Sequence, residues 1–180
     1  MAERNFQFRQ RLNIIHRTDR RDPAEQPRDG ETVIGEGWRI VVNPAPSDYL
    51  LGVAQDLQDY LLRSMGVSTL LVRGEGVGAA RTIRLTTAAE APALGQGLSK
   101  PRSYRLQVAG ETITVCGADE RGIGQGCYYL EDLMNLRQGP FLDAQDLLRE
   151  PLFSPRMVHS GWGIDQFPDT QLNAIAHAGM

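Results

Sequence analysis

A β-hairpin followed directly by a helix is the feature that most limits how this chain can fold. Residues 103–108 and 112–116 alternate apolar and polar side chains, and Ala109-Gly110 supplies the turn between them. Residues 121–137 then repeat apolar side chains at helical spacing, namely Ile123, Cys127, Leu130 and Met134. The hairpin face and the helix stripe must bury each other, so we expect the helix to pack on the strands.

The middle of the chain predicts a strand, a helix and two further strands. Residues 38–42 form a short apolar run, and Ser47 offers an N-cap oxygen to the helix that follows. The apolar residues of that helix are Leu50, Val53, Ala54, Leu57 and Leu61. Gly66 stands where a left-handed C-terminal residue belongs, and residues 67–72 and 82–86 predict strands.

These segments predict an α+β fold, with a mixed β-sheet and two main helices packed on one of its faces. Residues 143–151 allow one more short strand, and residues 11–16 allow another near the start. We divide the chain into a polar arm (1–30), an α/β domain (31–152) and a C-terminal unit (153–180). Acidic residues interleave with the arginines of the arm, which predicts a solvated mixed-charge segment.

The C-terminal unit predicts an isolated strand and helix. Ser154-Pro155 interrupts the chain, residues 157–164 are extended, and residues 169–177 place Leu172, Ile175 and Ala176 on one helix face. The chain stops at Met180, where a second strand is expected. We interpret 153–180 as the first β-α unit of a (β/α)8 barrel, an orphan whose apolar surface needs the rest of the barrel or self-association through residues 155–180.

Composition excludes several classes of partner. The net charge of −3 argues against a nucleic-acid partner. The first thirty residues lack a signal-peptide apolar core, and no run is long enough to span a bilayer, so we expect a cytoplasmic protein without a membrane partner. Cys116 and Cys127 are expected to be buried thiols.

The motifs of the chain predict no cofactor and no metal. The three histidines, His16, His159 and His177, are far apart, and no Cys-His cluster has zinc spacing. The glycines of residues 122–126 lack the spacing of a dinucleotide fingerprint, so we expect them to let the helix approach the sheet closely. The adjacent carboxylates of Glu131 and Asp132 are expected to be solvated.

The strongest candidates for ligand contact lie in the C-terminal unit. The segment that contains His159, Ser160, Trp162 and Asp165 would end at the carboxyl edge of a barrel strand, where substrate is handled in such barrels. Trp162 could stack on a sugar ring and Asp165 could accept hydrogen bonds from hydroxyls. Equally, Trp162 could be a core aromatic and Asp165 a cap of the next helix.

The hairpin and helix resemble the small α/β domain that precedes the catalytic barrel in family 20 glycoside hydrolases, the β-N-acetylhexosaminidases. The domain is also similar to the front domains of α-glucuronidases and of O-GlcNAc-hydrolase-like enzymes. The positions that carry the resemblance are Asp119, Gly122, Gly126, Tyr129, Leu130 and Leu133. The start of the barrel is matched by Pro155, Arg156, Gly161 and Asp165, whereas Ser160 stands where hexosaminidases hold a substrate-binding Arg.

The resemblance implies a non-catalytic accessory domain of a glycoside hydrolase, hexosaminidase-like or α-glucuronidase-like, that supports the catalytic barrel. The carboxylates of that family lie on later barrel strands, so we expect no catalytic residue in these 180 residues. His159, Trp162 and Asp165 would contact carbohydrate only in the intact parent enzyme. The alternative is an autonomous module that binds a carbohydrate or a protein without enzymatic activity.

Overall fold

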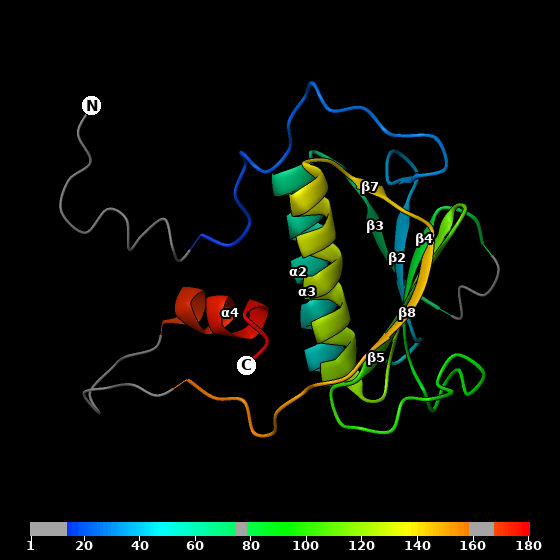
Figure 1. Cartoon of the computed structure of the whole chain (residues 1–180), viewed down its shortest axis with the longest axis vertical. Coiled ribbons are helices and arrows are strands. Elements are labelled where there is room, and N and C mark those ends of the chain that lie inside the picture. The colour runs from blue at the N-terminus through cyan, green and yellow to red at the C-terminus, as the bar shows by residue number, and fades with distance from the viewer. Residues whose placement is uncertain (1–13, 75–78, 159–167) are drawn as a thin grey trace.

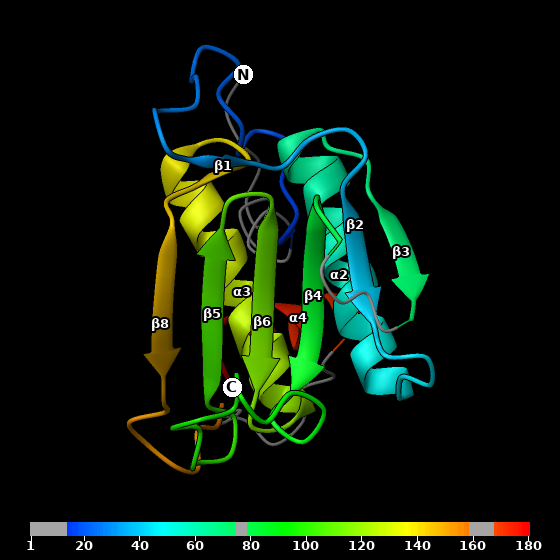
Figure 2. The same ribbon diagram turned by 90° about the vertical axis from the view of Figure 1, so that its right-hand side faces the viewer.

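A six-stranded mixed sheet forms the centre of the computed structural model, which describes residues 14–74, 79–158 and 168–180. The strand order is β3-β2-β4-β6-β5-β8 (Figure 2). The bounds of these strands, in chain order, are Arg39–Val42 (β2), Leu70–Arg73 (β3), Thr82–Thr87 (β4), Tyr104–Ala109 (β5), Thr112–Gly117 (β6) and Gln145–Arg149 (β8). Strands β2, β3, β4 and β6 run parallel, and β5 is antiparallel to both β6 and β8. The predicted mixed sheet and its hairpin are therefore confirmed.

Two helices, α2 (Asp48–Met65) and α3 (Glu120–Arg137), cover the same face of the sheet (Figure 1). The N-cap of α2 is the predicted one, because the Ser47 hydroxyl accepts a hydrogen bond from the Leu50 amide at 3.1 Å. Gly66 ends this helix in the left-handed region, with φ 67°. Asp119 caps α3 in the same way, by accepting from the Gly122 amide at 2.7 Å.

Glycines bring α3 unusually close to the strands, as the sequence predicts. A Cβ atom on Gly126 would lie 2.4 Å from a methyl carbon of Val115, and one on Gly122 would lie 2.3 Å from the Ser103 carbonyl oxygen. Cys127, between this helix and the core, is a buried free thiol, and so is Cys116. The glycines therefore serve packing rather than phosphate binding.

Two further short strands, which the sequence does not predict, form a second sheet. Strand β1 (Thr32–Val33) pairs antiparallel with β7 (Phe141–Leu142). Each strand has only two residues, which is too short for a period of two to be recognised. This small sheet ties the chain that precedes β2 to the chain that follows α3.

The described part of the arm, residues 14–30, is exposed or half-buried and contacts the helix ends. Arg21 donates to the Met65 carbonyl at 2.7 Å, and Arg137 forms ion pairs with Glu25 and Glu31. Glu31 lies 2.7 Å from the guanidinium with its side chain 1% exposed. The expected strand over residues 11–16 is absent from 14–16, the part of it that the structure describes, because these residues pair with no other strand.

A third layer lies on the side of the helix pair that faces away from the sheet (Figure 1). It contains α4 (Asp169–His177), which confirms the helix predicted over residues 169–177. Residues 157–158 belong to no strand, and the rest of the expected strand, 159–164, lies outside the described residues. No helix in the described parts of the chain is long and apolar enough to cross a membrane.

Two glycine-to-alanine substitutions test the close packing of α3. Gly126→Ala should lower the free energy of unfolding by about 1–3 kcal/mol, because the new methyl group overlaps Val115. Gly52→Ala is the matched control: a Cβ there meets nothing within 4 Å, and the residue is exposed inside α2. It should raise stability by about 0.5–1 kcal/mol. Urea unfolding of both variants measures the difference, and equal effects would refute this packing.

The Arg137 ion pairs predict a specific sensitivity to acid. The Arg137 guanidinium holds the pKa of the Glu31 carboxyl below its usual range. The stability from this pair is therefore present above the ordinary Glu pKa of 4.5 and lost as the pH falls below it. Arg137→Met should lower the urea midpoint at pH 7 and flatten its fall toward pH 3. Arg63→Met, which removes an exposed pair with Asp59, should change neither.

Candidate functional site

The three candidate ligand residues, His159, Trp162 and Asp165, lie outside the described residues. Their role stays a prediction. The described part of the chain instead brings together four titratable side chains that the sequence analysis did not connect.

This cluster lies between the helix pair and α4 and consists of His16, Asp56, Glu131 and His177. One nitrogen or oxygen atom from each residue lies within 4.8 Å of the others. The four residues come from four separate segments, namely the N-terminal segment, α2, α3 and α4. The fold therefore joins positions that are up to 161 residues apart (177 minus 16).

The helix pair supplies the two carboxylates. Asp56 immediately precedes the core residue Leu57, and Glu131 lies one helical turn after the core residue Cys127, so both stand at the edge of an apolar stripe. The hydroxyl of Tyr60, on α2, donates to the Glu131 backbone carbonyl at 3.0 Å and so joins the two helices at this level. The Glu131 side chain is only 4% exposed.

His177 enters the cluster from the end of α4. Its Nε2 lies 3.0 Å from Asp56 Oδ2 and 3.2 Å from Glu131 Oε2. Its Nδ1 donates to the Asn173 backbone carbonyl at 2.9 Å, one helical turn earlier. The ring packs on Tyr128 with centroids 4.1 Å apart. His177 thus anchors α4 to both helices of the pair.

His16 approaches from the N-terminal segment. Its Nε2 lies 3.6 Å from Asp56 Oδ1 and 4.0 Å from Glu131 Oε2, and its side chain is 9% exposed. The imidazole makes edge contacts with Tyr60 and His177, at centroid distances of 5.7 and 5.6 Å. Two imidazoles therefore face two carboxylates in a largely dehydrated space.

Burial and proximity shift the protonation of the cluster in opposite directions. Burial raises the pKa of Glu131 to about 7. Burial also opposes the ionisation of Asp56 and of His177, but their charged partners outweigh this effect. Hydrogen bonds from the two histidines hold the pKa of Asp56 well below its usual range. Asp56 and Glu131 raise the pKa of His177 to about 10. The site therefore attracts positive charge.

The expectation that Glu131 is solvated is wrong, whereas Asp132 is exposed as expected. Glu131 follows Cys127 by four residues, so it belongs to the buried side of α3, and this spacing was available in the sequence. The sequence does not predict that His16 lies next to His177, because only the tertiary structure brings these two residues together.

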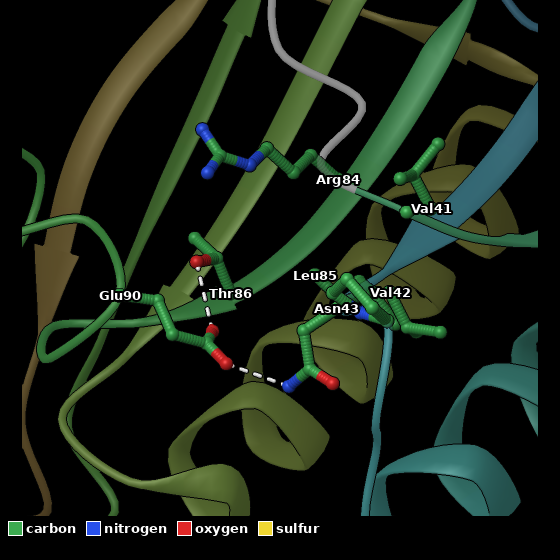
Figure 3. A pocket seen from close by; sticks show the side chains of 9 residues that line it. Val41, Val42, Asn43, Arg84, Leu85, Thr86 and Glu90 are labelled. Carbon is green, nitrogen blue, oxygen red and sulfur yellow. Dashed lines mark hydrogen bonds between the residues drawn. The ribbon is translucent and has the colours of Figure 1, made fainter.

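A cavity of about 450 Å³ lies where β2 and β4 end. Figure 3 shows Asn43 and Thr86 pointing toward the Glu90 carboxylate, to which they donate at 2.6 and 3.1 Å. Burial raises the pKa of Glu90, but these two bonds and a third from the Thr87 amide outweigh burial and hold the pKa below its usual range. Glu90 thus joins its own loop to the end of β2. The described residues that line the cavity include no aromatic ring.

No protein-family model matches this chain, and no curated protein matches it. Solved structures match its fold. A mutant Streptomyces plicatus beta-hexosaminidase in complex with its product GlcNAc superposes with a TM-score of 0.55 and 21% identity, over 76% of this chain and 27% of that one.

The Flavobacterium johnsoniae chitobiase gives a TM-score of 0.51 and 18% identity, over 81% of this chain and 22% of that one. The chain therefore spans about a quarter of the length of these two structures. What it shares with them is the fold of an α/β unit.

The ring contact between Tyr128 and His177 predicts how firmly α4 is held. Tyr128→Leu keeps apolar bulk but removes the aromatic contact, worth about 1 kcal/mol. Amide hydrogen exchange in α4 should then be about fivefold faster, with the urea midpoint of the whole chain unchanged. Leu136→Ala, at an 83% exposed position on α3, should leave exchange in α4 as it is. Unaltered exchange in Tyr128→Leu would contradict this account of the docking.

Proposed function

We propose that this chain is a non-catalytic accessory domain of a glycoside hydrolase, and that it supports a catalytic barrel built from later residues. The observation that carries the proposal is the fold likeness to a beta-hexosaminidase and a chitobiase. Those enzymes extend well beyond the matched part, and the parent enzyme proposed here does so too. Its specificity would be hexosaminidase-like or α-glucuronidase-like.

The surface around α4 supports this role. A run of large apolar side chains is exposed where the chain leaves β8 and approaches α4: Leu152, Phe153, Met157 and Val158. Leu172 on α4 is 48% exposed. Apolar surface of this kind normally marks an interface. We assign it to the rest of the barrel; in the isolated chain, a second copy could cover it through residues 155–180.

Three carboxylates among the described residues are placed unsuitably for glycoside hydrolysis. Glycoside hydrolysis uses two carboxyl groups that flank the scissile bond, about 5–10 Å apart. Asp56 and Glu131 are engaged with histidines between the helix layers, and Glu90 is bonded to its own loop. Among the described residues, none of these three carboxylates faces an open cleft opposite a second one. Contacts of Trp162, Asp165 and His159 with carbohydrate belong to the parent enzyme in this proposal.

The cavity at the ends of β2 and β4 favours a second candidate, an autonomous binding module. Sugar rings are commonly held by an aromatic face, and the residues that line this cavity offer amide, carboxylate, guanidinium and aliphatic groups instead. A polar or protein ligand would suit it better than a stacked sugar.

Two measurements test the proposal. The purified 180-residue chain should not hydrolyse chromogenic N-acetyl-β-hexosaminides or α-glucuronides above the buffer rate, while a hexosaminidase run in parallel does. The coding sequence beyond Met180 should continue with further βα units and an adjacent Asp-Glu pair. Turnover by the chain itself would refute the non-catalytic role. A stop codon after Met180, together with saturable binding of a sugar or a protein, would favour the binding module.

A further inference from the structure

We propose that His16, Asp56, Glu131 and His177 form a Zn²⁺ site that fastens the N-terminal segment and α4 to the helix pair. This inference is independent of the proposed function, since it concerns how three layers of the chain are held together.

The spacing fits a four-coordinate ion. Zn²⁺ binds imidazole nitrogen and carboxylate oxygen at about 2.0–2.2 Å, so a tetrahedral set places neighbouring ligand atoms about 3.3–3.5 Å apart. His177 Nε2 lies 3.0 Å from Asp56 Oδ2 and 3.2 Å from Glu131 Oε2, and His16 Nε2 lies 4.0 Å from Glu131 Oε2 and 3.6 Å from the other Asp56 oxygen, Oδ1. One ligand atom from each residue lies within 4.8 Å of the other three, so the cluster would contract slightly around the ion.

Three atoms of the cluster are buried without a hydrogen bond of acceptable geometry, namely His16 Nε2, Asp56 Oδ2 and His177 Nε2. Glu131 faces the two histidines with Oε2. Buried polar atoms are rarely left without a hydrogen bond, because the loss of hydration costs about 1–3 kcal/mol for each. A cation at the centre would satisfy these three atoms together. The Glu131 side chain, 4% exposed, is the most deeply buried of the four.

The charges balance for a divalent ion. Two ionised carboxylates carry −2 and two neutral imidazoles add nothing, so one Zn²⁺ would neutralise the site.

Neighbouring groups hold the ligands in the required form. The Nδ1–H of His177 donates to the Asn173 carbonyl, which leaves Nε2 of the neutral ring free to bind a metal. The Asn173 side-chain amide donates to Asp56 Oδ1 at 3.2 Å. One residue of α4 thus orients two ligands at once, an arrangement typical of the groups that support metal ligands.

The ligand set favours Zn²⁺ over the hard cations. Ca²⁺ and Mg²⁺ take six or more oxygen ligands, whereas this site offers two nitrogens and two carboxylates in a closed space. All four coordination positions belong to the protein, which is the pattern of a structural rather than a catalytic zinc site. The ion would close a loop between residues 16 and 177.

Metal titration of the full chain tests the site. Chelator-treated protein, titrated with ZnCl₂ in a calorimeter, should bind one ion per chain. Glu131→Gln and His177→Ala should weaken binding at least 100-fold. Asp132→Asn is the matched control, because this exposed carboxylate is the neighbour of Glu131 on α3; its affinity should equal that of the unmodified chain. Circular dichroism checks that each variant is folded. If His177→Ala does not fold, the affinity of the more conservative variant Glu131→Gln decides the test.

Two further readouts separate this site from adventitious binding. Co²⁺ in place of Zn²⁺ should give the intense visible absorption of a tetrahedral ion. Zn²⁺ should also slow amide exchange in residues 14–17 and 169–179 of the unmodified chain but not of Glu131→Gln. Absence of 1:1 binding, or binding that Glu131→Gln leaves intact, would overturn the proposal. Equal weakening by Asp132→Asn would overturn it too, since it would indicate a diffuse acidic surface.

Discussion

The burial of two carboxylates between neighbouring helices is the constraint on which the outer part of this structure depends. Asp56 and Glu131 lie at the edge of the apolar stripes of α2 and α3, where they meet His177 of α4, and Glu131 is almost completely removed from water. A buried carboxylate is costly unless it is paired. His16 and His177 supply the partners, and each brings a separate segment of the chain with it. The apolar core holds the sheet to the helices, whereas this polar cluster holds the third layer to the helices (Figure 1).

The same cluster gives the proposed accessory role a physical basis. A domain that supports a following barrel has to hold the first elements of that barrel in a fixed place. Here α4 is held through the end of its last turn, by His177, and through Asn173 one turn earlier. Apolar residues next to it remain exposed and available for burial. A Zn²⁺ ion at the cluster would stiffen this junction without adding any catalytic group.

Local signals in the sequence predict most helices and strands, α4 included, but not the contacts between distant segments. Ser47, Gly66 and the hairpin turn act through neighbouring residues, so their effects follow from spacing alone. The β1–β7 pair is too short to leave a periodic pattern, and the approach of His16 to His177 depends on how whole segments pack. Glu131 lies between these cases: its position on the stripe of α3 predicts burial, but a carboxylate is usually assigned to solvent. Such conflicts between spacing and chemistry mark the residues worth examining for function.

A double-mutant cycle between Glu131→Gln and His177→Gln tests the central claim most directly. The free energy of local opening of α4, from amide exchange at pH 7 in the presence of a chelator, is measured for the unmodified chain, the two single variants and the double variant. If the buried carboxylate holds α4 through His177, the two substitutions should be coupled by about 1–3 kcal/mol. Additive effects, with a coupling energy near zero, would show that α4 is held by other contacts and would contradict the account.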